Sequence, residues 1–196
     1  MLTIRKGGHV ELERFYSAME IDFDAKELIG KWSIHRAMSA GDVELLLFTD
    51  EESRIDVGYA LVVCRGLNGY VLLKYVAIQP WYRGKGLGIE AMRLLNKRYA
   101  DRQGLLAELT VFDEPDGSYL RKLRKFFSRF GYVQVESDYR LGGAPVTLMV
   151  KPVQGPWDIA PIAHRLIRDF YSRCLFFGAY DRMIDIKPAP AGEKSE

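Results

Sequence analysis

A strand that runs into a glycine-rich turn at residues 76–88 constrains the fold of this chain more than any other segment. The run Val-Ala-Ile-Gln-Pro-Trp-Tyr-Arg-Gly-Lys-Gly-Leu-Gly starts apolar and ends with glycines at 84, 86 and 88. Glycine permits positive φ and close approach of a ligand, so successive backbone N–H groups can converge on an anion. The helix expected next adds unpaired N–H groups and the positive end of its dipole. The turn therefore predicts a phosphate-binding site; the alternative is an ordinary strand-to-helix turn.

The spacing of the glycines narrows the kind of site. A P-loop requires Gly-x4-Gly-Lys-Ser/Thr and a dinucleotide-binding turn requires Gly-x-Gly-x-x-Gly, whereas this chain has Arg-x-x-Gly-x-Gly from Arg83 to Gly88. Preceded by Val-x-Ile and Pro-x-Tyr, that pattern resembles the acetyl-coenzyme A loop of the GNAT superfamily of N-acetyltransferases. The basic run Arg-Lys-x-Arg-x-Phe at 121–126, with Glu108 upstream, looks similar to an uncharacterised bacterial subgroup of that superfamily.

Length and composition favour one globular domain with room for a small appendage. The 196 residues are 48% hydrophobic, and no apolar run approaches the ~20 residues that a membrane helix needs. The N-terminus lacks the apolar core of a signal peptide, so we expect a cytoplasmic location. A net charge of +2 gives no reason to expect nucleic acid or an anionic membrane as partner. Cys64 and Cys174 lie outside any metal-ligand spacing and are expected to be free thiols, and no metal is expected.

The hydrophobic periodicity predicts an α/β (α+β) order that the GNAT resemblance also implies. That resemblance covers residues 1–152 and implies the GNAT fold, a mixed central sheet of about seven strands flanked by helices, with splayed central parallel strands. Residues 153–186 are expected to form a helical extension around a helix at 159–177, and 187–196 a disordered tail. The expected elements of the core are strands at 2–5, 43–49, 57–64, 70–78, 105–112, 133–140 and 145–150 and helices at 9–21, 25–40, 87–100 and 119–130.

The resemblance implies where acetyl-CoA would bind as co-substrate. Pantetheine would lie in the gap beside the splayed strand and hydrogen-bond the backbone of Val76 and Ile78, with an amide at or near Val76 polarising the thioester carbonyl. Ser128 is a candidate to contact the 3′-phosphate or adenine end of the cofactor. The residues expected to bind the cofactor through the strand and the loop are Val76, Ala77, Ile78, Arg83, Gly84, Lys85, Gly86, Leu87 and Gly88.

Transfer also needs a base for the amine and a proton source for the departing thiolate. Glu108 is the candidate base, because it interrupts an apolar strand that should exclude charge; the alternative is an ion pair with a nearby arginine. The tyrosine that the superfamily commonly uses as the acid is replaced by Phe127. Tyr82 and Tyr139 are weak substitutes, beside water or an unassisted departure of the thiolate.

The expected function is transfer of an acetyl group to a primary amine, in a small molecule or a peptide, by direct attack in a ternary complex. Glu20, Asp22 and Asp24 lie near the helix connection that shapes the acceptor site in this superfamily, although each also suits a solvated surface. The absence of a hydroxyl at Phe127 keeps a second possibility, a catalytically weak acyl-CoA-binding sensor or interaction module. The extension packs on the domain or builds a homodimer interface.

Overall fold

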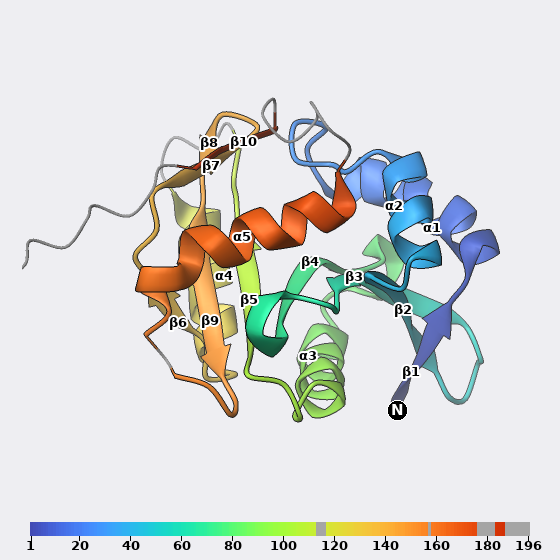
Figure 1. Ribbon diagram of the computed structural model, residues 1–196. Coiled ribbons are helices and arrows are strands. Elements are labelled where there is room, and N and C mark those ends of the chain that lie inside the picture. The colour runs from blue at the N-terminus through green and yellow to red at the C-terminus, as the bar shows by residue number, and fades with distance from the viewer. Residues whose placement is uncertain (113–116, 157, 176–182, 187–196) are drawn as a thin grey trace, which may run out of the picture.

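The computed structural model describes residues 1–112, 117–156, 158–175 and 183–186 (Figure 1). Helices and strands alternate along the chain much as the hydrophobic pattern predicts. The elements are β1 Leu2–Gly7, α1 His9–Asp22, α2 Lys31–Ser39, β2 Val43–Asp50, β3 Asp56–Val63, η1 Leu67–Gly69, β4 Tyr70–Ile78, η2 Pro80–Tyr82, α3 Leu87–Arg98, β5 Gly104–Leu109, α4 Ser118–Ser128, β6 Val133–Val135, β7 Tyr139–Leu141, β8 Ala144–Pro145, β9 Thr147–Pro152, α5 Ala160–Cys174 and β10 Ile184–Ile186.

Seven strands form the central sheet, in the order β1-β2-β3-β4-β5-β9-β6. Its neighbouring strands are antiparallel except for β4 and β5, which run parallel. This is the mixed sheet that the sequence predicts. A smaller sheet of β10, β7 and β8 lies beside it.

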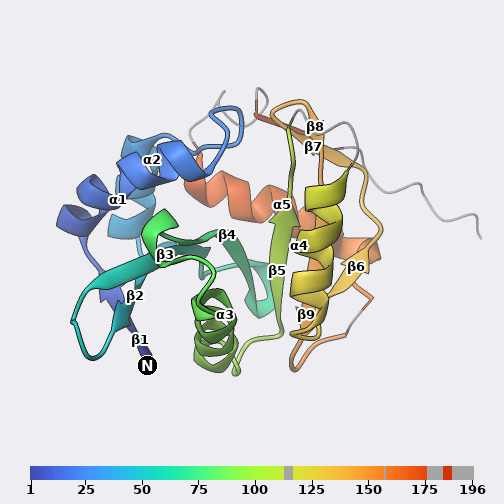
Figure 2. The ribbon, with the colours of Figure 1, turned by 180° about the vertical axis from the view of Figure 1, so that it is seen from behind.

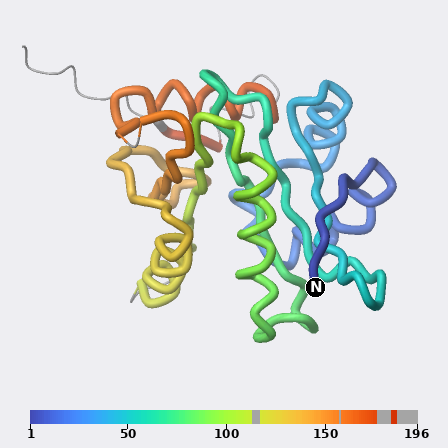
Figure 3. The backbone as a smooth tube through the Cα atoms, turned by 90° about the horizontal axis from the view of Figure 1, so that it is seen from below, coloured from blue at the N-terminus to red at the C-terminus, as the bar shows by residue number. Residues whose placement is uncertain are grey.

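Helices cover both faces of the central sheet. Buried side chains of α1, α2 and α5 share one core cluster, whereas α3 and α4 contribute to a second cluster on the opposite face. In Figure 3 the sheet is seen from below, with α5 on one side and α3 and α4 on the other. Strand residues alternate accordingly: Leu45 and Leu47 of β2 face the first cluster, and Leu46 and Phe48 face the second.

The parallel strands separate after a short common stretch. Their pairing ends at Leu73 and Ala107, although β4 continues to Ile78 and β5 to Leu109. From there β4 remains paired only with β3, and β5 only with β9. In Figure 2 the two strands diverge behind α3 and α4. The predicted splay is therefore confirmed, and it leaves one edge of β4 unpaired within the described residues.

A β-bulge lies where the splay begins. The register shifts between two pairs, Leu61 with Tyr75 and Val62 with Leu73, so Lys74 is the extra residue of β4. Leu73 packs in the α3/α4 cluster, whereas Tyr75 packs in the α1/α5 cluster. The ammonium of Lys74 also reaches the α1/α5 side, because it bonds the hydroxyl of a buried α5 tyrosine, Tyr171. The bulge thus directs two consecutive side chains to one face.

Three element boundaries differ from the sequence prediction. The helix expected from residue 25 begins only at Lys31, because the Ile29 N–H and the Glu27 carbonyl both bond the Tyr75 hydroxyl and cannot join a helix. The strand expected over 133–140 is two strands in different sheets, β6 and β7. The strand expected over 105–112 ends at Leu109.

Helix α5 packs its buried side chains into the first core cluster. Six of its residues are buried, and among them Phe170 is fully enclosed and would contact any side chain placed at Gly66. Arg173 pairs with Asp42 before β2 and with Asp169 on its own helix. Residues 176–177 of the predicted helix and the expected tail at 187–196 lie outside the described residues. None of the described helices is both long and apolar enough to cross a bilayer.

Candidate active site

The glycine-rich loop presents a run of backbone donors at the start of α3. Gly84 and Gly86 both have φ of 79°, and a Cβ at either position would meet no atom within 4 Å. In the described part of the chain, no backbone N–H from residue 84 to residue 88 donates to a protein acceptor; the next one, of Ile89, bonds the Gly86 carbonyl at 2.9 Å. Five adjacent donors at a helix N-terminus match the needs of a diphosphate.

The unpaired edge of β4 leads to this loop. The Gln79 N–H donates to the Val57 carbonyl at 2.9 Å, so every second residue before it, Ala77 and Tyr75, also directs its backbone groups toward β3. Val76 and Ile78 therefore direct theirs toward the gap. Their N–H and C=O groups can accept an extended, amide-containing ligand as an additional strand, as predicted for pantetheine.

Arg83 turns its side chain away from the loop. Its Nε donates to the Ile78 carbonyl at 2.7 Å, and its guanidinium forms a short ion pair with Asp22 at the end of α1. Asp22 also accepts a hydrogen bond from the Tyr59 hydroxyl at 2.8 Å. Among the predicted phosphate contacts, the Arg83 backbone N–H already donates to the Pro80 carbonyl at 3.2 Å in this conformation, while Lys85 remains exposed with its ammonium 5.8 Å from the Tyr82 ring centroid.

Glu108 lies in a buried group that we call the Lys74 cluster: Lys74, Glu108, Tyr139 and Tyr171. The side chains of Lys74 and Glu108 are 1% and 2% exposed, and their Nζ–Oε2 distance is 3.0 Å. Glu108 also accepts hydrogen bonds from Tyr171 at 2.6 Å and Tyr139 at 2.8 Å. Lys74 in turn donates to the Tyr171 hydroxyl at 2.7 Å. Four side chains from β4, β5, β7 and α5 thus meet at the apex of the splay.

Both carboxylate oxygens of Glu108 accept hydrogen bonds within the Lys74 cluster. Burial and the neighbouring carboxylate raise the pKa of Tyr139 and of Tyr171 well above the usual range for tyrosine, so both hydroxyls stay protonated and donate to Glu108. Glu108 would have to give up hydrogen bonds before it could receive a substrate proton. This geometry favours the ion-pair alternative for Glu108, with Lys74 as the partner where an arginine was expected.

The two candidate acids, Tyr82 and Tyr139, lie apart from each other. Tyr82 packs on the α3/α4 face, opposite to Glu108, whereas Tyr139 belongs to the Lys74 cluster. Phe127 is 8% exposed and packs edge-on against Tyr132 at a centroid distance of 5.2 Å. Ser128 is exposed at the C-terminal end of α4.

The carboxylates predicted for the acceptor side lie at the end of α1 and in its connection to α2. Glu20 is exposed, Asp22 is paired with Arg83, and Asp24 accepts the Lys26 N–H at 2.8 Å. Glu27 is half-buried, and burial raises the pKa of its carboxyl. Its carboxylate forms no ion pair with the described residues, and a backbone hydrogen bond from Asp24 opposes the effect of burial on its pKa.

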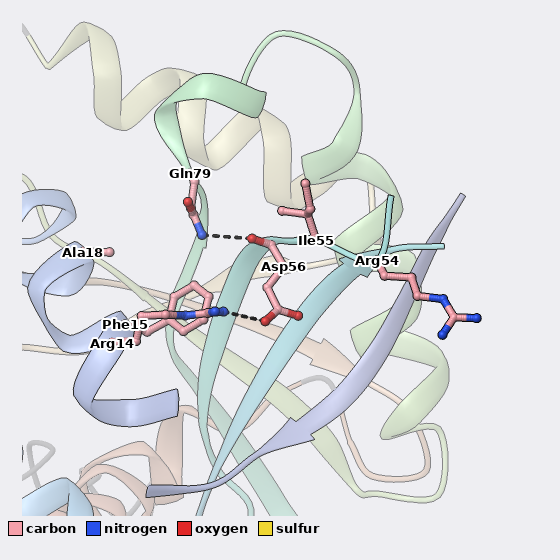
Figure 4. A pocket seen from close by; sticks show the side chains of 7 residues that line it. All are labelled: Arg14, Phe15, Ala18, Arg54, Ile55, Asp56 and Gln79. Atoms are coloured by element: carbon pink, nitrogen blue, oxygen red, sulfur yellow. Dashed lines mark hydrogen bonds and ion pairs between the residues drawn. The ribbon is translucent and has the colours of Figure 1, made fainter. Parts of the chain in front are cut away.

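A pocket of 430 Å³ opens between α1 and Gln79, the residue that follows the end of β4 (Figure 4). The Gln79 amide donates to the Asp56 carbonyl at 3.0 Å, and the Asp56 carboxylate accepts from Arg14 at 2.5 Å and from Arg5 at 2.8 Å. The pocket thus combines an apolar wall with a neutralised carboxylate. It is lined by Arg14, Phe15, Ala18, Arg54, Ile55, Asp56 and Gln79.

Sequence reasoning missed Lys74, Glu27 and Tyr171. Lys74 is a lone charge inside the apolar strand at 70–78, the same signal that identified Glu108, and could have been found in the same way. Tyr171 is an ordinary aromatic residue of an amphipathic helix, and no local signal marks it. Within the described residues no three His, Cys, Asp or Glu side chains gather as a metal ion requires.

Comparison with solved structures identifies the fold. An acetyltransferase assigned to the GNAT family from Bacteroides thetaiotaomicron is similar, with a TM-score of 0.67, 13% identity, and coverage of 87% of this chain and 96% of the other. The spermidine/spermine N-acetyltransferase from Vibrio cholerae, in mutant forms, has a TM-score of 0.59 at 14% identity, covering 78% and 94%. The ribosomal-protein-S18-alanine N-acetyltransferase from Escherichia coli has a TM-score of 0.57 at 15% identity, covering 80% and 96%. The chain has the fold of the GNAT superfamily, and the predicted resemblance is confirmed at that level.

Sequence comparison adds nothing to this assignment. No protein-family model matches the chain, and no curated protein matches it. At 13–15% sequence identity, the likeness to these solved structures supports the fold assignment alone and does not indicate the substrate.

Replacing Gly86 by alanine is expected to weaken CoA binding about tenfold. An L-residue at φ of 79° is strained by about 1–2 kcal/mol, so the loop relaxes and reorients a donor that would face the diphosphate. One lost hydrogen bond to a charged group, about 1.5 kcal/mol or more, corresponds to about tenfold in Kd. Isothermal titration with CoA measures the effect. Gly41→Ala introduces similar strain at φ of 74° far from the loop, and should leave the Kd unchanged; equal Kd values for the two variants would contradict the loop assignment.

Proposed function

We propose that the protein is an acetyl-CoA-dependent N-acetyltransferase that transfers the acetyl group directly to a primary amine in a ternary complex. The observation that carries this proposal is the run of five free backbone N–H groups at 84–88, placed where the unpaired edge of β4 ends. A strand edge followed by an anion site suits a ligand that joins an amide-containing arm to a diphosphate. The GNAT fold supports the same assignment.

Each part of the site has a role in this proposal. The backbone of Val76 and Ile78 binds the pantetheine amides beside Ala77, and an N–H near Val76 polarises the thioester carbonyl. Such a donor contributes a few kcal/mol to transition-state stabilisation. Lys85 and the amides from Gly84 to Gly88 hold the diphosphate. The acceptor approaches from the α1/α5 face, with the pocket beside Gln79 available for the part of the acceptor remote from its amine.

A second function is supported by Phe127. Because this ring is buried and has no hydroxyl, the chain lacks the acid that the family commonly uses at this position. An acyl-CoA-binding sensor or interaction module with little turnover is therefore the alternative. The proposed cofactor site is common to both functions.

Two measurements separate these functions. The enzyme is expected to release free CoA from acetyl-CoA in the presence of members of a panel of primary amines and amine-terminal peptides, detected by a thiol reagent. Tight CoA binding by titration without turnover of any amine would favour the sensor. Failure to bind CoA at all would reject both.

A further inference from the structure

The segment between α1 and α2 is tethered to the apex of the splay by one hydroxyl group. The Tyr75 hydroxyl accepts a hydrogen bond from the Ile29 N–H at 2.8 Å and donates one to the Glu27 carbonyl at 2.8 Å. Tyr75 follows the bulged residue Lys74 and is itself buried. Since both contacts are to backbone, they fix the main chain of Glu27 next to the point where β4 leaves β5.

Glu27 differs from the other carboxylates that border this point. Asp22 is held by Arg83 and Tyr59, and Glu108 by three donors of the Lys74 cluster. Glu27 is half-buried, and its carboxylate has a backbone hydrogen bond from Asp24 but no ion pair with any described residue. A partly desolvated carboxylate without a cation partner destabilises the free protein, and an arriving cation would relieve that penalty.

Charges on several elements act on Glu27. Burial is the largest influence and raises the pKa of Glu27, and the charges of Glu108 on β5 and Asp24 on the same segment add to this shift. Lys74 on β4 and a backbone hydrogen bond from Asp24 oppose it. The Tyr75 hydroxyl donates a hydrogen bond to the Glu27 backbone carbonyl. Cys174 on α5 contributes to the raised pKa of Tyr75. A carboxylate with a raised pKa is a stronger base than an exposed one.

We propose that Glu27 binds the ammonium group of the acceptor and takes its proton, which makes Glu27 the general base of the proposed acetyl transfer. The proton passes from the ammonium nitrogen to a Glu27 carboxylate oxygen. The freed lone pair forms the N–C bond to the acetyl carbonyl carbon as the C–S bond breaks and the thiolate leaves with the bonding electrons. A second proton passes from the new amide nitrogen to the thiolate, which gives the amide and CoA thiol, and Glu27 returns its own proton to solvent. Glu108 could act in this way only after losing hydrogen bonds to Lys74, Tyr139 and Tyr171, whereas Glu27 breaks no ion pair with a described residue.

The first test reads stability and needs no turnover. Because burial raises the folded-state pKa of Glu27, its favourable contribution is present at low pH and is lost as pH rises through that pKa. Glu27→Gln should therefore gain stability relative to the wild type between pH 4 and pH 8 in chemical denaturation. Glu52→Gln, at an exposed position on the β2–β3 hairpin, should show no such trend. If the free energies of unfolding of Glu27→Gln and the wild type change in parallel with pH, the claim that the Glu27 carboxylate lacks a cation partner is wrong.

The second test measures turnover and binding of an amine. Only its kinetic part rests on the proposed function. Glu27→Gln should lower kcat/KM by about 10²–10³-fold, abolish the acidic limb of the pH profile, and leave the Kd for CoA unchanged. Undiminished activity would overturn the assignment. If the wild type turns over no amine, titration of butylammonium into the protein, with butanol as the uncharged control, still decides: selective binding that is lost in Glu27→Gln supports the site, and equal binding by both proteins rejects it.

Discussion

Lys74→Met should lower the free energy of unfolding by about 3–5 kcal/mol. The substitution removes the ammonium but leaves the Glu108 carboxylate 2% exposed, with two tyrosine hydroxyls and no cation. The penalty for an uncompensated buried charge greatly exceeds the packing change, since methionine has nearly the length of lysine. Urea denaturation at pH 7.5, followed by circular dichroism, measures the loss.

The double variant Lys74→Met/Glu108→Gln separates the charge from the packing. Removing both charges should restore much of the lost stability, because the amide still accepts hydrogen bonds from Tyr139 and Tyr171. The thermodynamic cycle then gives a coupling of several kcal/mol between the two residues. A loss below 1 kcal/mol in Lys74→Met alone would show that Glu108 is not a charged member of a closed cluster.

Ending the chain after Pro152 should abolish cooperative folding. The deletion removes α5, which contributes side chains to the larger core cluster; replacing Phe170 alone by alanine would cost about 3–5 kcal/mol. Loss of the whole helix exceeds the 5–15 kcal/mol by which a typical domain is stable. It would also remove Tyr171 from Glu108.

Thermal unfolding of purified chains checks this second result. The truncated chain should show no sigmoidal transition, whereas a chain ending at Ile186, which keeps every described element, should unfold like the full protein. A cooperative transition in the chain ending at Pro152 would show that residues 1–152 form an independent domain with α5 as an appendage, as the sequence first predicts.

The order of elements and the glycine turn before α3 could be predicted because both depend on local signals. Apolar periodicity distinguishes helices from strands, and glycines at 84 and 86 fit a backbone with positive φ. The Lys74 cluster could not be predicted in this way. Strict alternation along 70–78 places Lys74 and Tyr75 on opposite faces, and only a bulge, which depends on pairing with β3, brings them together.

The late start of α2 has a similar cause. Residues 25–30 carry no residue that forbids a helix except Gly30 at its end, so local propensity extends the helix backward. A hydroxyl on β4, about 45 residues away in the sequence, competes successfully for the backbone groups of Glu27 and Ile29. That contact, made between distant segments, places the carboxylate that sequence analysis overlooked.

Arg83 joins two regions that the proposed reaction assigns to different substrates. Its backbone belongs to the donor loop, its Nε holds the Ile78 carbonyl at the gap, and its guanidinium holds Asp22 at the end of α1. An acetyl donor that hydrogen-bonds the Ile78 carbonyl competes with Arg83 for that group. This competition alters the ion pair between Arg83 and Asp22 on α1, the helix that precedes Glu27. Binding of one substrate would then change the affinity for the other by a common factor, so the two binding equilibria are thermodynamically linked through a single side chain.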